Sequence, residues 1–359
     1  MAEGSGWKWR KTSKRQRAGK NSQQIQGERI EYHVHNHTGL SMEDAIDLYA
    51  RLSRADAQRY TEAAFTKIDQ RVDEFLVNYF ERQSSVDPDG LSSLEDPFMQ
   101  RSLRDAQIEF ATSGSEDLGQ VLVDLLVQLS NRERSSLSAI ALRDAIQIVP
   151  KLKQEHLNTL SVIVALRCTI YNAWNSFHEM YGSLSETVAP LANEYSDGGL
   201  GYRHMQGLGL GWFGMSEGEV SAMFLARYPG LFTKGINFGD IPTDIANKVR
   251  IIPALRDERK VQLAITSQGS VDAHVEEGNF TDEQGRRISA IIRTNLMSEL
   301  EVKEEFERRV PAMRSLLHAW RHTSNMHEFD LTSTGFAIGH ANLQAKSKAP
   351  VPLNVYIPQ

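Results

Sequence analysis

The sequence predicts a mainly α-helical protein with one N-terminal β-strand and a smaller α+β part at its C-terminal end. Apolar residues recur at spacings of three and four over long stretches, which is typical of amphipathic helices. Near the N-terminus a single segment alternates with the period of a strand. From about residue 196 glycine and aromatic residues cluster, which indicates shorter elements. The 359 residues, 40% hydrophobic and 24% charged, have an ordinary globular composition with room for two or three domains.

Residues 1–20 are strongly basic and lack apolar periodicity, which predicts an arm that is disordered in isolation. Trp7 and Trp9 alternate with basic residues, so the arm suits nucleic acid or an anionic membrane surface, or serves only as a solubilising tail. Its net charge is +6, which leaves −12 on the remainder of a chain of net charge −6. The predicted polyanion-binding residues are Lys8, Arg10, Lys11, Lys14, Arg15, Arg17 and Lys20.

Residues 21–39 contain the predicted strand. Ile30, Tyr32 and Val34 share one face of the alternating segment. A lone strand leaves its backbone donors and acceptors unpaired, and no strand pattern flanks this one. We therefore expect copies of the chain to pair through this segment. The predicted oligomerisation residues are Ile25, Gln26, Ile30, Tyr32 and Val34.

The opposite face of this strand carries His33, His35 and His37. One strand spreads the three imidazoles over about 14 Å, too far for one ion to bind all of them. Copies arranged around a symmetry axis could instead contribute one histidine each to a ring, which would suit zinc, nickel or iron. The alternative is a solvated polar face, and no other cofactor is expected.

Three further regions follow the strand in the predicted domain order. They are a long helix over 40–85, a helical bundle over 91–195 and an α+β domain over 196–359. Within the bundle, residues 154–181 are apolar nearly all round, which predicts a buried central helix. In the last domain one amphipathic helix is expected from Thr281 to about Val310. Its charged residues predict an ordinary solvent-facing surface. They are Glu301, Lys303, Glu304, Glu305, Glu307, Arg308 and Arg309.

The search for catalytic motifs favours a protein that is not an enzyme. The chain has no Gly-x-Ser-x-Gly, Walker A or His-Glu-x-x-His string. Gly209-x-Gly211-x-x-Gly214 matches a dinucleotide fingerprint as a string, but no buried strand precedes it. These glycines more readily permit tight turns and close backbone contact. An enzyme site at the glycine-rich crossing 196–215 remains the alternative, with titratable groups near Arg203, His204 and Glu217.

Location is inferred from cysteine usage and apolar runs. No apolar run reaches the roughly 20 residues that cross a bilayer, and no secretory leader is recognisable at the N-terminus. The single cysteine, Cys168, lies in an apolar helical run, where its thiol is expected to be inert. One thiol forms no internal disulfide, which suggests a reducing cytoplasm.

The segment LTSTGFAIGHANL, residues 331–343, resembles the end of a winged-helix wing followed by a helix. Such modules bind DNA or other proteins, so a DNA-binding regulator is a second alternative. Only Lys346 and Lys348 are basic nearby, which weakens the DNA interpretation. A role in the core or in a protein contact is favoured.

The chain also resembles an uncharacterised bacterial family of helical proteins. The residues that carry the likeness are Asn21, Ser22, Ile25, Gln26, Gly27, Gly39, Leu40 and Ser41, together with 148–152 and 331–343. Strands of the Asn-Ser-x-x-Ile-Gln type resemble self-assembly elements at the front of bacterial conflict and anti-phage proteins. This resemblance implies a non-enzymatic oligomeric sensor or scaffold in phage defence, whose expected partners are its own copies and a second defence protein.

Overall fold

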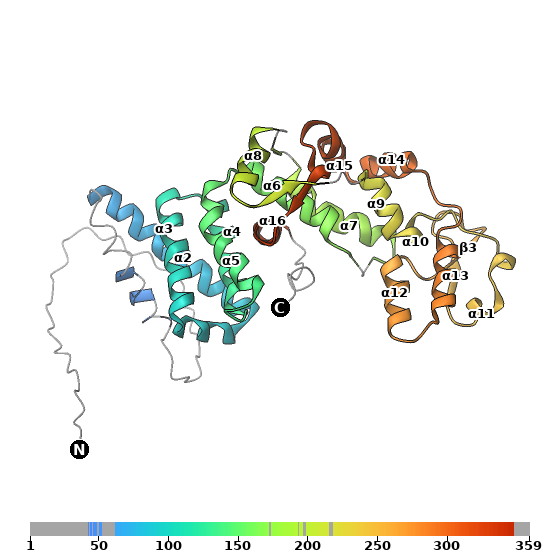
Figure 1. The fold of residues 1–359 in the computed structure, drawn as a ribbon, viewed down its shortest axis with the longest axis horizontal. Coiled ribbons are helices and arrows are strands. Elements are labelled where there is room, and N and C mark those ends of the chain that lie inside the picture. Colours follow the sequence, from blue (N-terminus) through green and yellow to red (C-terminus); the bar gives the residue numbers. More distant parts are fainter. Residues whose placement is uncertain are drawn as a thin grey trace, which may run out of the picture. The chain divides into compact units, whose positions relative to one another are not determined.

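The fold is described from a computed structural model. It describes residues 42, 44, 46–48, 50–51, 62–171, 174–192, 194–196, 199–214 and 218–347. Contacts divide the chain into two units, Met1–Thr38 and Gly39–Gln359, and every described residue belongs to the second. The mainly α-helical fold that the sequence predicts is confirmed (Figure 1).

The first helices pack on one another around a large apolar core. Caps and prolines fix their boundaries: the Asp96 carboxylate accepts the Phe98 amide hydrogen at 2.8 Å, ahead of Pro97. Pro150 lies just after the last turn of α5. It ends the helix, because proline has no amide hydrogen to donate within a helix interior. These elements are α2 (Glu62–Val86), η2 (Pro88–Glu95), α3 (Pro97–Ser113), α4 (Glu116–Ser130), α5 (Leu137–Ile148) and η3 (Val149–Lys151).

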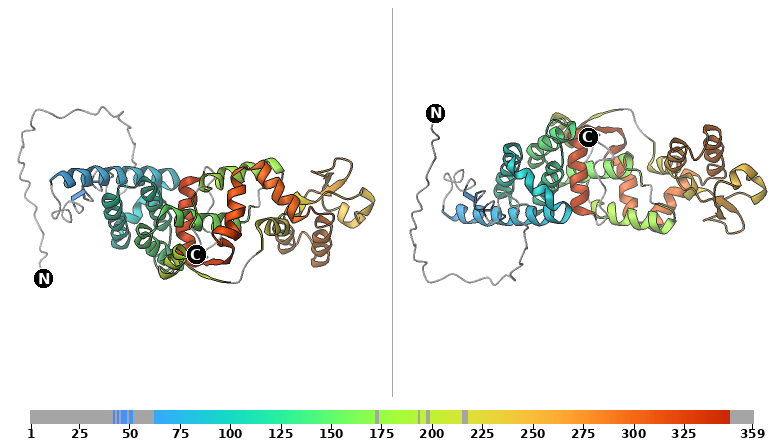
Figure 2. Two further views of the ribbon diagram at one scale, coloured as in Figure 1. Left: turned by 90° about the horizontal axis from the view of Figure 1, so that it is seen from above. Right: turned by 90° about the horizontal axis from the view of Figure 1, so that it is seen from below.

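Helix α6 (Gln154–Ile163) is buried from His156 onwards, as expected for the centre of the bundle, and its buried residues include polar side chains. It packs against α16 (Ser333–Lys346), which also contacts α4 and α5 (Figure 2). The expected extent, residues 154–181, is wrong. The helix passes into a π-turn, η4 (Val164–Cys168), and Thr169 is extended. Among the described residues no helix is both long and apolar enough to cross a membrane.

A second apolar cluster lies in the C-terminal half and is smaller than the first. Its buried members are Ile241, Ile245, Val249, Leu263, Ile265, Val271, Phe280, Ile288 and Ile292. We call the part of the chain around it, residues 233–295, the small lobe. Its elements are η6 (Phe238–Asp240), α11 (Thr243–Ala246), β2 (Ile251–Pro253), β3 (Val261–Leu263), α12 (Gln268–Glu276) and α13 (Asp282–Ile292).

The described residues also form two antiparallel two-stranded ribbons. Strand β2 pairs with β3, and β1 (Gly211–Phe213) pairs with β4 (Phe329–Leu331) across a long stretch of sequence. A Cβ at Gly211 would lie 2.4 Å from the Asp330 carbonyl oxygen, and Gly209 has a φ of 75°. These two glycines therefore serve a turn and a close backbone approach, as the sequence suggested.

The helix expected from Thr281 to Val310 is two helices. Asn295 adopts a left-handed φ of 56°, and Leu296 forms a β-bridge with Thr233. A new helix, α14 (Glu299–Arg309), then begins at the Ser298 cap. The remaining elements are α7 (Phe177–Thr187), η5 (Ala189–Leu191), α8 (Leu200–Gly207), α9 (Val220–Arg227), α10 (Pro229–Phe232), α15 (Ala312–His318), the π-turn η7 (Ala319–Thr323) and η8 (Met326–Glu328).

Candidate anion-binding groove

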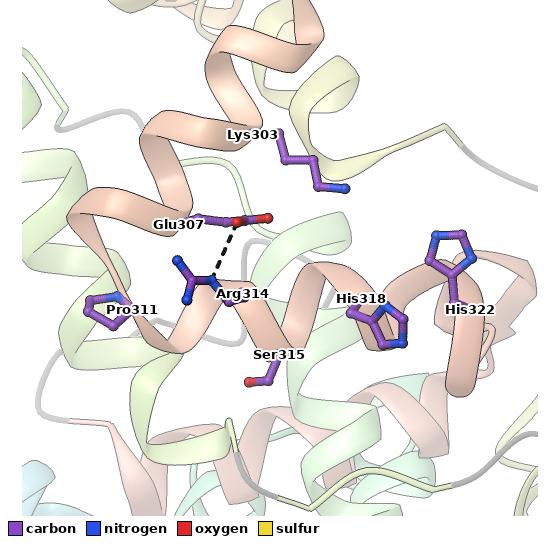
Figure 3. Close-up of a pocket in the computed structure, with 7 residues that line it drawn as sticks. All are labelled: Lys303, Glu307, Pro311, Arg314, Ser315, His318 and His322. Carbon is purple, nitrogen blue, oxygen red and sulfur yellow. Dashed lines mark ion pairs between the residues drawn. The ribbon is translucent and has the colours of Figure 1, made fainter.

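A groove of about 540 Å³ lies along α14, α15 and η7. Figure 3 shows Lys303 and Glu307 projecting from α14, with the remaining polar side chains on the α15–η7 side. Most of its lining side chains carry or can accept a positive charge. The lining residues are Lys303, Glu307, Pro311, Arg314, Ser315, His318 and His322.

The α14 side of the groove is fixed by a capping box and two buried anchors. Ser298 accepts the Glu301 amide hydrogen, and the Glu301 carboxylate accepts the Ser298 amide hydrogen at 2.7 Å. Val302 and Phe306 are fully buried. Lys303 and Glu307 each follow one of these anchors and are four residues apart, so they share a face beside the buried one.

The opposite side begins where α14 ends at Val310. Pro311 is the N-cap of α15 and redirects the chain, because proline cannot continue the preceding helix. Met313, Leu316 and Leu317 bury the inner face of α15. The groove-lining side chains of α15 alternate with these buried residues at spacings of three and four, which places them on its outer face.

The π-turn η7 extends this face to His322. His318 and His322 are four residues apart, so they share one face, and the i to i+5 bonded turn η7 begins between them. The His318 and His322 rings have centroids 5.3 Å apart and are tilted by 35°. Isolated π-turns occur frequently at functional sites.

The side chains that line the groove are mainly basic, although the chain beyond residue 20 has a net negative charge. Arg314 Nε lies 3.5 Å from Glu307 Oε2, a pair in which the arginine side chain is 76% exposed. Such an exposed pair contributes little to stability, so the guanidinium can turn to a ligand. In the described part of the chain, no carboxylate lies within ion-pair distance of Lys303. Two full cations thus face one anion, and the histidines add charge when protonated.

The other face of α14 contacts the small lobe, so the expected solvent-facing charged surface is wrong for Glu305, whereas Glu304, Arg308 and Arg309 are exposed as expected. Glu305 is buried and accepts hydrogen bonds from Arg256 Nη1 at 2.5 Å and the Tyr181 hydroxyl at 2.6 Å. Glu301 contacts Lys234 Nζ at 2.9 Å. Hydrogen bonds from Ser298 and from Lys234 lower the pKa of Glu301 to about 2. Helix α14 therefore lies between the groove and the small lobe.

In the alternative site at residues 196–215, His204 lies against His156 of α6. His204 Nε2 lies 2.9 Å from the Lys151 carbonyl oxygen, and its ring centroid is 5.4 Å from that of His156. Buried His156 accepts the Lys153 amide hydrogen at Nδ1, which completes the start of α6. Arg203 is exposed, and Glu217 lies outside the described residues.

Helix α16, within the winged-helix-like segment, is a core helix. Residues 335–343 are all buried, so this part leaves no exposed face to enter a DNA groove. The Ser161 hydroxyl contacts the Gly339 carbonyl oxygen at 2.9 Å, and Asn342 Nδ2 donates to the Ser161 oxygen at 2.7 Å. Lys346 contacts Asp117, and Lys348 lies outside the described residues.

The other predicted site residues, those of the arm and strand at 1–38, lie outside the described part of the chain. This includes the histidines at positions 33, 35 and 37. Within the described part, no three histidine, cysteine or acidic side chains gather closely enough to hold a metal ion. The sequence analysis did not single out Arg314, His318 or His322; their common stripe at spacings of four was the available signal.

Comparison with known proteins gives a family assignment. A family model described as ":-like" matches residues 39–357. This match spans well over half of the chain, so the protein belongs to that family. The description states no activity, ligand or partner. No curated protein and no solved structure matches the chain.

Proposed function

We propose that this protein is a non-enzymatic, self-assembling sensor or scaffold whose helical body binds an anionic, phosphate-bearing ligand in the α14–α15 groove. The observation that carries the proposal is the convergence of Lys303, Arg314, His318 and His322 on one groove. Lysine and arginine are the usual binders of phosphate. Their concentration here contrasts with the net −12 of the chain beyond residue 20.

The N-terminal segments supply the assembly and a second anionic contact in this proposal. Strands around Ile30, Tyr32 and Val34 pair between copies and bring the basic arms together, so that the arms bind a polyanion with an avidity that one arm lacks. The likeness of residues 21–27 to strands of conflict proteins supports a place in bacterial anti-phage defence. The single cysteine supports a cytoplasmic location.

The groove is tested with inorganic tripolyphosphate as the probe. Titration calorimetry uses the arm-neutral chain, which is the full-length chain with the seven basic residues of the arm replaced by glutamine. Lys303→Ala and Arg314→Ala should each weaken binding about tenfold, because a hydrogen bond to a charged group contributes about 1.5–3 kcal/mol. Glu307→Gln should strengthen binding, since it removes the one carboxylate of the groove.

Arg308→Ala is the matched control, because it removes the same charge from an exposed position of α14 outside the groove. It should leave tripolyphosphate binding within about twofold of the parent chain. Equal weakening by Lys303→Ala and Arg308→Ala, or no measurable binding by the arm-neutral chain, would contradict an anion site in the groove.

A further inference from the structure

The dimensions and the charge of the groove restrict the chemical class of ligand that it can bind. A volume of about 540 Å³ lies within the range of about 300–1,000 Å³ that is typical of small-molecule sites. A long polymer would extend beyond the groove and over the rest of a chain whose residues after position 20 carry a net charge of −12. Charges separated by more than about 8 Å are largely screened at physiological ionic strength, so a compact anion meets mainly the local cations. The charge distribution therefore favours a small phosphate ligand over a polymer.

The side chains of the groove also offer surfaces for a base. The two histidine rings lie next to each other on the same face as Arg314. Imidazole rings and arginine guanidinium planes are both groups on which nucleic-acid bases stack. Arg314 and His322 are eight positions apart in the sequence, which corresponds to roughly 12 Å of helix axis. This leaves room for phosphates at one end of the groove and a base at the other.

We propose that the groove binds a nucleotide, with its phosphates held by Lys303 and Arg314 in place of the exposed Arg314–Glu307 pair and its base against His318 and His322. This inference rests on the proposed anion-binding function and specifies the ligand class. Figure 3 shows Lys303 extending from α14 towards the histidine side, Glu307 between Lys303 and Arg314, and the two histidines beyond Arg314 along the opposite side. The π-turn η7 is the element that carries His322 into this position.

Three kinds of probe test the proposal on the arm-neutral chain by titration calorimetry in magnesium-free buffer. The buffer is kept at about pH 8, well above the reference pKa of imidazole near 6.5, so that the comparison measures stacking rather than charge. The four common ribonucleoside triphosphates are compared with tripolyphosphate, which lacks a base, and with adenosine, which lacks phosphate. At least one triphosphate should bind about tenfold more tightly than tripolyphosphate, which is within the range expected for one stacked base. Adenosine should not bind measurably.

Variants assign the two ends of the ligand. The double variant His318→Ala/His322→Ala should reduce nucleotide affinity to that of tripolyphosphate without changing tripolyphosphate binding. Arg314→Ala should weaken both. Nucleotides that bind no more tightly than tripolyphosphate would overturn the nucleotide and leave the anion groove standing. Binding of neither probe would overturn both. Nucleotide binding that survives every groove variant would also overturn the proposal, because the site would lie elsewhere.

Discussion

At the scale of single residues, His156 shows how burial changes what a histidine does. Its ring is buried against His204, and its Nδ1 atom accepts the Lys153 amide hydrogen at 3.1 Å. Burial lowers the pKa of His156 below its usual value near 6.5, and it outweighs the opposing attraction of Glu155. Protonation at Nδ1 would also remove the acceptor at the start of α6. The neutral ring is therefore the form that the fold requires.

This residue makes the free energy of unfolding depend on pH. Because the folded-state pKa lies below that of the unfolded chain, the unfolded state binds more protons in the window between the two values. Stability should therefore fall as pH decreases from about 6.5 towards the lower folded-state pKa. His156→Gln should remove this part of the pH dependence, as measured by urea denaturation at a series of pH values.

The exposed His178 of α7 supplies the control. His178→Gln should reproduce the pH profile of the parent chain. A parent profile and a His156→Gln profile that run parallel through this window would show that the histidine proton is not linked to folding.

At the scale of elements, α14 connects two parts of the molecule. Lys303 and Glu307 line the groove, whereas Glu305 faces Arg256 of the small lobe. The Arg256 guanidinium also lies 4.2 Å from the Phe177 ring centroid. Both charged side chains of this pair are nearly buried, at 14% and 9% exposure. The pair is therefore costly to break, although a well-packed apolar replacement of both members need not be.

We expect Arg256→Met to lower the free energy of unfolding by about 3–5 kcal/mol, because it leaves the Glu305 carboxylate buried without its cation. The double variant Arg256→Met/Glu305→Gln should recover a large part of this loss. Urea denaturation measures both. A control at the exposed pair of Arg286 and Glu283, Arg286→Met, should cost less than about 1 kcal/mol. A similar cost for the two arginine variants would contradict the role assigned to burial.

The elements also show which features can be inferred from sequence. Helical periodicity led to the correct fold class, because it is a local signal. The break before α14 was missed, since apolar spacing continues through it. The left-handed Asn295 and the cap formed by Ser298 and Glu301 interrupt the helix there. The cap is visible in the sequence as Ser-x-x-Glu, so this boundary could have been found.

The groove and the buried carboxylate were beyond local inference. In the sequence, Glu305 does not differ from the other acidic residues of its charged helix. Its partner Arg256 lies 49 residues away in the chain. Lys303 faces the α15 side only because the chain reverses at Pro311. His318 and His322 are four residues apart, which already predicts a common helix face, but their meeting with Lys303 across the groove is a tertiary contact. The secondary-structure elements can therefore be predicted from local sequence patterns, whereas the groove depends on tertiary contacts that these patterns do not reveal.

At the scale of the whole molecule, charge is divided between an arm of +6 and a remainder of −12. If the arm is the polyanion contact, its binding to nucleic acid must be electrostatic and strongly dependent on salt. Each phosphate neutralised on a single strand contributes about −0.7 to the slope of log affinity against log salt. The proposed assembly would multiply this contact, because linked binding events can raise avidity by about a hundredfold or more.

Two full-length variants separate these contributions. The arm-neutral chain should lose its affinity for a single-stranded oligonucleotide, with a salt slope near zero, and keep the parent mass in light scattering. The double variant Ile30→Asp/Val34→Asp should fall to the mass of one chain and bind the oligonucleotide about a hundredfold more weakly, because single arms act alone. Both should keep the groove's affinity for tripolyphosphate. Oligonucleotide affinity that survives arm neutralisation would instead place nucleic-acid recognition on the body, as the DNA-binding alternative requires. An unchanged mass after the strand substitutions would remove the strand from the assembly interface.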